Sequence, residues 1–284
     1  MGHEVVLFCV IRNDLQRLKQ FLSYYRNLGV TSFIFMDNAS TDGTYEYLQE
    51  QSDVTLYRET SKYSAINRNI WVHNLLETHG RNKWCIVADS DEFISYIGCE
   101  THNLSDLIEV AEAEHYDAIT GFLLDMYSES KMFDAKTFSM DNQQYFDYTG
   151  YTIENQWFGI IMYGGPRKRL FDINNGIAKY SLFYYREGIS YTNAHHLRID
   201  NTVRLSPIWF AIRHYKFQTE FDLTKMRDAV ANRTYYNNSK DYVPIYEYMQ
   251  KRCTPTMYNY DVSRLYKNSK SLRCIDILQE PFGK

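Results

Sequence analysis

The chain has 284 residues, of which 44% are hydrophobic and 23% charged, and its formal net charge is −4. This length and apolar content allow a sizeable core in one large domain or two modest ones, and the slightly acidic balance argues against nucleic acid as a partner. Five scattered cysteines without a CxxC pair argue against a disulfide framework or structural zinc site and favour a reducing compartment. Because we find no cationic, apolar leader and no apolar run of about 18 residues, we expect neither a signal peptide nor a membrane span. The expected location is cytoplasmic.

Strand and helix signals alternate in the first part of the chain. Short, β-rich apolar runs at 4–11, 32–36, 54–57 and 84–88 predict four strands, and the segments between them carry apolar residues at helical spacing. Such alternation predicts parallel strands joined by right-handed crossovers, and so an α/β fold.

The later part of the chain has a different pattern. We expect a helix at 101–116, an irregular β-rich region from 117 to about 215, and further helices beyond it. The prediction is one domain over 1–215, with halves 1–100 and 101–215, followed by a helical C-terminal extension over 216–284.

The first polar cluster is "FIFMDNASTDGT" at 33–44, where an apolar strand ends at Asp37 and Asn38. Ligands of parallel α/β sheets bind at the carboxyl ends of the strands. A strand-end Asp can accept hydrogen bonds from a nucleobase or ribose. The alternative is an ordinary connection between strand and helix, with Asn and Gly chosen for backbone geometry.

The second cluster is Asp89-Ser90-Asp91, directly after the apolar "WCIVA" run. Side chains alternate along an extended segment, so both carboxylates lie on one side. They would repel each other unless a cation lay between them, and Mg²⁺ or Mn²⁺ prefers such oxygen ligands. A solvated acidic loop is the alternative.

Cations and histidines supply the other candidate ligands. Lys62 and Arg68 flank the start of a predicted helix, where they could face phosphate. "GGPRKRLF" at 164–171 joins a flexible backbone to three cations, which could also grip phosphate, or could form a basic surface hairpin. The histidine candidates are His195, His196 and His214.

Taken together, these segments resemble a known family. "RNDLQRLKQFLSYYRNLGVTSFIFMDNASTDGT", then "WCIVADSDEF", the "GGPRKRLF" run with Lys179 after it, His195 or His196, and "HYKFQTEFDLTKMRD" from His214 resemble the glycosyltransferase family 2-like group with the GT-A fold. The resemblance covers residue 5 to about 230. The chain departs from the pattern at Asp14, where the branch usually has Glu, and at Phe217, where it often has Ser.

The resemblance implies a Rossmann-like, mostly parallel sheet flanked by helices, with nucleotide binding in 1–100 and acceptor binding in 101–215. It implies a metal-dependent transfer of sugar from a UDP- or GDP-sugar to the hydroxyl of a glycan or lipid-linked acceptor. Asp37 would contact the base or ribose, Asp89 and Asp91 would bind Mn²⁺ or Mg²⁺ with Asp91 the more direct ligand, and His214 would be the third ligand. The further donor-binding candidates are Arg12, Asn38, Lys62, Arg68 and Asp89.

An inverting transfer also needs a base for the acceptor proton. Our candidate is Asp125, after the apolar run at 121–124, and the alternatives are Asp134 and Glu154.

Two other functions remain open. A sugar nucleotidylyltransferase would need a Gly-rich loop after the first strand, and "CVIRNDLQRL" has no Gly there. A non-catalytic carbohydrate- or partner-binding relative is the rival from another class.

The segment 251–273 carries six cations against a single acid, with three tyrosines among them. This composition predicts a peripheral contact with an anionic membrane, as an enzyme of bacterial surface polysaccharide synthesis would need. A solvated helical surface or a contact within a homo-oligomer is the alternative.

Overall fold

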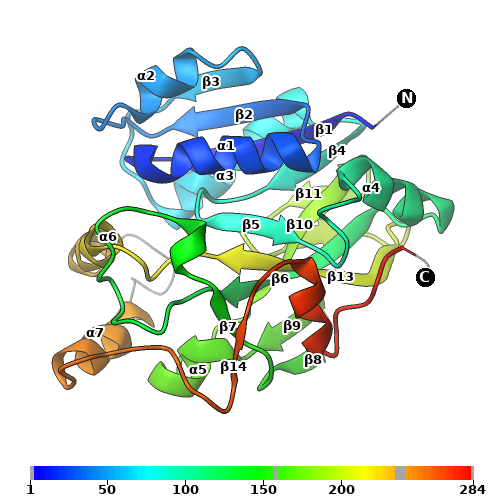
Figure 1. Cartoon of the computed structure of the whole chain (residues 1–284). Helices are drawn as coiled ribbons and strands as arrows, with labels where there is room; N and C mark the ends of the chain where they lie inside the picture. Colours follow the sequence, from blue (N-terminus) through cyan, green and yellow to red (C-terminus); the bar gives the residue numbers. More distant parts are fainter. Residues whose placement is uncertain (1–2, 157–158, 234–240, 283–284) are drawn as a thin grey trace.

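A computed structural model describes residues 3–156, 159–233 and 241–282. Its centre is an eight-stranded sheet with the order β3-β2-β1-β4-β10-β6-β13-β5 (Figure 1). The first four strands are parallel neighbours: β1 (Val5–Ile11), β2 (Ser32–Asp37), β3 (Val54–Arg58) and β4 (Lys83–Val87). They are connected through α1 (Leu15–Leu28), α2 (Thr44–Gln49) and α3 (Ala65–His79). The alternation in the sequence therefore predicted this half correctly.

The other half of the sheet mixes strand directions. Here β13 (Leu205–His214) is parallel to β6 (Ala118–Asp125), while β10 (Ala178–Tyr185) runs antiparallel between β4 and β6. β5 (Glu92–Ser95) forms the edge, antiparallel to β13. The expected α/β, Rossmann-like class with a mostly parallel sheet flanked by helices is confirmed.

Smaller elements surround this sheet. They are α4 (Leu104–Ala113), the 3₁₀ helix η1 (Met140–Asn142), β7 (Tyr145–Asp147), β8 (Thr152–Gln156), β9 (Gly159–Tyr163), α5 (Gly165–Phe171), β11 (Ile189–Tyr191) and β12 (Leu197–Ile199). The "GGPRKRLF" segment is the helix α5, so its interpretation as a flexible loop or hairpin was wrong. Pro166 occupies the first turn, where its missing N–H has no cost.

The C-terminal part begins with α6 (Glu220–Asn232) and α7 (Val243–Gln250), as the helical pattern predicted. The chain then returns to the domain. β14 (Ser263–Leu265) pairs with β7, and the 3₁₀ helix η3 (Ser269–Cys274) begins where the Ser269 amide donates to Glu100. No helix in the described ranges has both the length and the apolar content needed to span a bilayer.

Two apolar layers enclose the sheet because successive strand side chains point to opposite faces. Val5, Leu7 and Cys9 of β1 face the layer that contains the apolar side of α1, whereas Val6 and Phe8 face the layer that contains α3. Burying each large side chain contributes roughly 1.5–3 kcal/mol. This packing fixes β1, β2 and β4, and with them the strand ends that carry the polar clusters.

Candidate functional site

The register of the sheet brings three polar segments together at the ends of β13, β6 and β5. His214, the last residue of β13, lies opposite Asp125 of β6 and Glu92 of β5. The Tyr215 amide donates to the Asp91 carbonyl at 2.9 Å, which holds the 89–91 turn against the end of β13. The sheet thus assembles Asp91, Asp125 and His214 from strands that lie far apart in the sequence.

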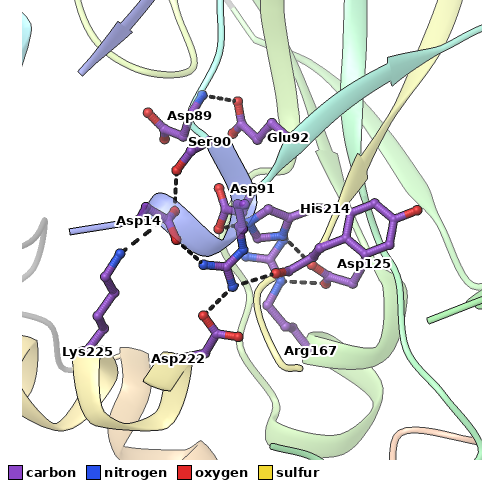
Figure 2. Close-up of polar contacts among 12 residues, drawn as sticks. Asp14, Asp89, Ser90, Asp91, Glu92, Asp125, Arg167, His214, Asp222 and Lys225 are labelled. Atoms are coloured by element: carbon purple, nitrogen blue, oxygen red, sulfur yellow. Dashed lines mark hydrogen bonds and ion pairs between the residues drawn. The ribbon is translucent and has the colours of Figure 1, made fainter. Parts of the chain in front are cut away.

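The side chains of Asp91, His214, Asp125 and Arg167 form a continuous chain (Figure 2). His214 Nδ1 lies 2.7 Å from Asp125 Oδ1, and His214 Nε2 lies 3.4 Å from Asp91 Oδ2. Arg167 Nε donates to the second oxygen of Asp125 at 2.6 Å. Because a carboxylate only accepts, Asp125 and Asp91 each accept from a ring N–H of His214, and together they favour the doubly protonated imidazole.

Charges shift the pKa values within this chain. Burial opposes the charge on each group, but the carboxylates of Asp91 and Asp125 outweigh it and raise the pKa of the His214 imidazole. Burial also opposes the charge on Asp91, and His214 outweighs it, so the pKa of Asp91 lies well below its usual value. Asp125 behaves in the same way, with Arg167 as the largest opposing charge, and its pKa is lowered.

A second group surrounds Asp89. Arg68 Nη2 donates to Asp89 Oδ1 at 2.6 Å, and its Nη1 donates to the Tyr191 hydroxyl at 2.5 Å. Glu92 accepts from the Asp89 amide at 2.9 Å and is ion-paired with buried Lys179. Despite burial, Arg68 and then Lys179 lower the pKa of Asp89. The structure therefore directs Asp89 to a cation of the protein.

A third group joins Ser90 to the first and sixth helices. The Ser90 hydroxyl donates to Asp14, whose carboxylate also accepts from Arg17 at 2.8 Å and lies 3.8 Å from Lys225 (Figure 2). Arg17 is also ion-paired with Asp222 at the start of α6. Asp14 is the residue before α1, but its side chain makes no capping bond to that helix. The sequence had no signal for this group, because Asp222 lies 205 residues from Arg17.

The Asp37 turn is tightly hydrogen-bonded. Asp37 and Asn38 are both 0% exposed. Asp37 Oδ1 accepts from the Ser40 amide at 3.0 Å, and Asn38 Nδ2 donates to the carbonyls of Glu59 and Ser61. Among the described residues, Asp37 Oδ2 and Asn38 Oδ1 have no hydrogen-bond partner. The turn thus has the local bonds of a structural connection and two unused acceptors, and nucleotide contact by these residues stays a prediction.

The other candidates differ in exposure. Arg12, just after β1, and Lys62, just before α3, are exposed, as are Asp134 and Glu154. Asp125 is 2% exposed, and both of its oxygens are bonded to His214 and Arg167. Its role as base stays a prediction, and this geometry fits a residue that orients His214.

The donor atoms around Asp91 suit a divalent ion only in part. Among the described residues there is no group of three or more His, Cys, Asp or Glu side chains arranged to hold a metal ion. Asp91 and His214 supply one oxygen and one nitrogen donor that face each other, and the carboxylate behind His214 is the usual outer partner of a ligating imidazole. The remaining ligands of a Mg²⁺ or Mn²⁺ ion are commonly substrate phosphates and water.

Comparison with known proteins yields no family model and no curated protein that matches. Three solved structures are similar in fold. TarS 1–349 of S. aureus in complex with UDP is 14% identical, with 46% of this chain and 40% of that chain covered and a TM-score of 0.34. The mannosyltransferase PcManGT of Pyrobaculum calidifontis in complex with GDP-Man and Mn²⁺ is 16% identical, with 44% and 36% covered and a TM-score of 0.32.

A nucleotidyl transferase of Methanothermobacter thermautotroptrophicus is 11% identical, with 80% of this chain and 97% of that chain covered and a TM-score of 0.31. This chain spans less than half the length of TarS 1–349 and of the mannosyltransferase. At such identities and TM-scores, these likenesses do not indicate an activity or a substrate for this chain.

Proposed function

We propose that the chain is a metal-dependent glycosyltransferase of the GT-A type, which moves a sugar from a UDP- or GDP-sugar to an acceptor hydroxyl. The observation that carries the proposal is the pairing of Asp91 with His214 Nε2 at a strand-end turn, with Asp125 fixing the imidazole from behind. The Asp91 carboxylate is an oxygen donor of the kind that Mn²⁺ and Mg²⁺ prefer, and His214 adds a nitrogen donor beside it.

Each residue has a distinct part in this proposal. Asp91 and His214 hold the ion, which supplies a Lewis acid for the diphosphate leaving group. Asp125, itself held by Arg167, fixes the orientation of the His214 ring, and a bound ion would take the place of the proton on Nε2. The exposed cations Arg12 and Lys62, together with the Asp37 turn, are proposed to bind the donor nucleotide.

A nucleotidylyltransferase is the less favoured alternative because the end of β1 offers no open phosphate cradle. The amides of Asn13, Asp14 and Leu15 donate to the side chains of Ser40, Thr44 and Asp42, at 2.9, 3.0 and 3.1 Å respectively. A phosphate at the start of α1 would have to displace all three bonds. A non-catalytic binding relative would be favoured by loss of an acid of the 89–91 turn, and both acids are present.

We further propose that the acceptor is a glycan or a lipid-linked molecule and that the enzyme works at the cytoplasmic face of a membrane. Within 251–273, Tyr260 is 85% exposed, whereas Tyr258 packs against Tyr145 and Tyr266 packs against Arg213. Membrane contact through this segment therefore rests on its cations and on Tyr260. Because α6 contributes Asp222 and Lys225 beside the 89–91 turn, we include the start of 216–284 in the functional unit with 1–215.

The test is calorimetric titration with UDP and GDP in MnCl₂ and in EDTA, followed by hydrolysis assays with a panel of nucleotide sugars. We expect binding that weakens in EDTA, and metal-dependent release of nucleoside diphosphate. Asp91→Ala should abolish that release while the fold is retained, since the Asp91 side chain is 21% exposed at a turn.

The matched control is Asp53→Ala, which removes a carboxylate of similar exposure (29%) that pairs with Arg26. Asp53 lies just before β3, at the end of the strand opposite to the candidate site. It should leave binding and turnover intact. Equal nucleotide affinity in MnCl₂ and EDTA, or full activity of Asp91→Ala, would contradict the proposal.

A further inference from the structure

His195 occupies a fixed position beside the candidate site. It lies in the loop between β11 and β12, and this hairpin is anchored to the Asp89 group where the Tyr191 hydroxyl accepts from Arg68. The His195 amide donates to Asn193 Oδ1 at 2.9 Å, and its carbonyl accepts from the Tyr180 amide at 3.3 Å. The backbone at His195 is thus held at the start of β10, next to Lys179.

One hydrogen bond sets the tautomer of this imidazole. His195 Nδ1 lies 3.1 Å from the carbonyl oxygen of Ala178. A carbonyl oxygen can only accept, so the proton is on Nδ1 and the lone pair is on Nε2. The residue as a whole is partly exposed.

The surroundings keep this lone pair free of a proton. Burial and then the charge of Lys179, with a smaller contribution from Arg167, lower the pKa of His195 to about 3. Lys179 is ion-paired with Glu92, and Arg167 is ion-paired with Asp125. His195 therefore lies near two cations that also pair with carboxylates of the candidate site. At neutral pH the imidazole is therefore an uncharged acceptor in a strongly charged setting.

We propose that His195 is the general base of the reaction, with Nε2 taking the proton of the acceptor hydroxyl. The inference rests on the proposed function. The acceptor oxygen forms its bond to the anomeric carbon as its proton moves to Nε2, and the bond from that carbon to the diphosphate oxygen breaks. The nucleoside diphosphate leaves with the electron pair, and the imidazolium then gives its proton to solvent.

Two features favour His195 over the carboxylates at the site. Asp125 has both oxygens bonded to Arg167 and His214, and Glu92 is paired with Lys179 in the core. His195 has one ring nitrogen occupied and the other with a lone pair.

The bland alternative is that His195 only holds the hairpin through its bond to Ala178. His195→Asn separates the two roles, because the Asn amide keeps a donor at the position of Nδ1 and has no group at the position of Nε2. The control is His196→Asn, the same change at the next residue of the loop.

The experiment measures three quantities on the full chain: UDP affinity in MnCl₂ by calorimetry, the ring ¹⁵N signals of His195, and hydrolysis of UDP-glucose, UDP-galactose, UDP-N-acetylglucosamine and GDP-mannose. Water stands in for the acceptor, and its proton must also be removed. We expect unchanged UDP affinity in both variants, and a kcat for His195→Asn that falls by about 100-fold or more without a change in KM, partly restored by added imidazole. His196→Asn should keep its turnover.

The outcomes separate the inference from the proposed function. A wild-type chain that binds neither UDP nor GDP overturns both. Nucleotide binding and turnover with a fully active His195→Asn variant overturn the inference alone, as does a protonated His195 Nε2 at pH 7 in the ¹⁵N spectrum.

Discussion

Replacing Arg17 by Met should destabilise the protein strongly, because this guanidinium is the only cation buried between Asp14 and Asp222 in the described structure. The side chains of the three residues are 3%, 4% and 5% exposed. Removing one member of a buried ionic group leaves uncompensated charge and costs about 3–5 kcal/mol. Set against a total stability of roughly 5–15 kcal/mol, this is a large fraction.

The assay is equilibrium urea unfolding followed by circular dichroism. With a slope of about 3 kcal/mol per molar urea, the midpoint should fall by roughly 1–2 M. Arg213→Met is the matched control. Arg213 is 8% exposed, but it packs on the rings of Tyr24 and Tyr266, at 5.3 and 4.5 Å, instead of pairing with a carboxylate in the described chain. Its replacement forfeits two cation–π contacts of about 0.5–2 kcal/mol each and a hydrogen bond to the Tyr215 hydroxyl, but it leaves no carboxylate unpaired, so it should cost less than Arg17→Met.

Adding Asp14→Asn and Asp222→Asn to the Arg17→Met variant should recover much of the loss, since no unpaired charge then remains. The reasoning is refuted if Arg17→Met costs no more than Arg213→Met, or if the two Asn changes give no recovery.

Three further predictions concern the site and its surroundings. Asp91→Asn should abolish the difference between UDP affinity in MnCl₂ and in EDTA. Asp89→Asn should keep that difference and lower Tm, because Asp89 pairs with Arg68. Calorimetry and thermal unfolding measure the two effects, and the reverse pattern would contradict the assignment. The pKa of His195 is about 3 in the folded state and about 6.5 in the unfolded state, so the unfolded state binds more protons below pH 6.5. Between pH 7 and pH 5 the wild type should therefore lose up to about 2 kcal/mol of unfolding free energy relative to His195→Asn. Urea unfolding at each pH measures this difference. The six cations of 251–273, each contributing on the order of 1 kcal/mol, should bind the chain to anionic liposomes and not to neutral ones in a flotation assay, and salt should release it. Binding that persists in a chain ending near residue 250 would show that this segment is not the membrane contact.

The sequence predicted the features that depend on local patterns. β-rich runs that end in acids locate the carboxyl ends of β2 and β4, because alternating strands and helices force parallel packing. His214 was one of three candidate histidines, and the family resemblance gave it the role of third ligand. Its place beside Asp91 and Asp125 depends on the pairing of β13 with β5 and β6, which no local pattern encodes.

Two features could not be predicted for identifiable reasons. Two glycines and a proline signal a loop, but Gly164 and Gly165 have φ values of +139° and +74°, so they make the bend that enters α5, and Pro166 then fits its first turn. The partners of Asp14 include Ser90 in the 89–91 turn and Lys225 of α6, and contacts between segments so far apart in the sequence leave no local pattern.

The turn at 89–91 contacts three separate parts of the molecule. Asp89 binds Arg68 of α3, Ser90 binds Asp14 at the start of α1, and Asp91 faces His214 at the end of β13. Each of the three side chains thus has a partner in a different segment, and the turn is held from several sides. Any shift of α6 that moves Asp222 must pull on Arg17 and Asp14, and through Ser90 on the acids beside it. A ligand that binds Asp91 is therefore linked to α6 by a chain of contacts through Ser90, Asp14 and Arg17, without contacting that helix.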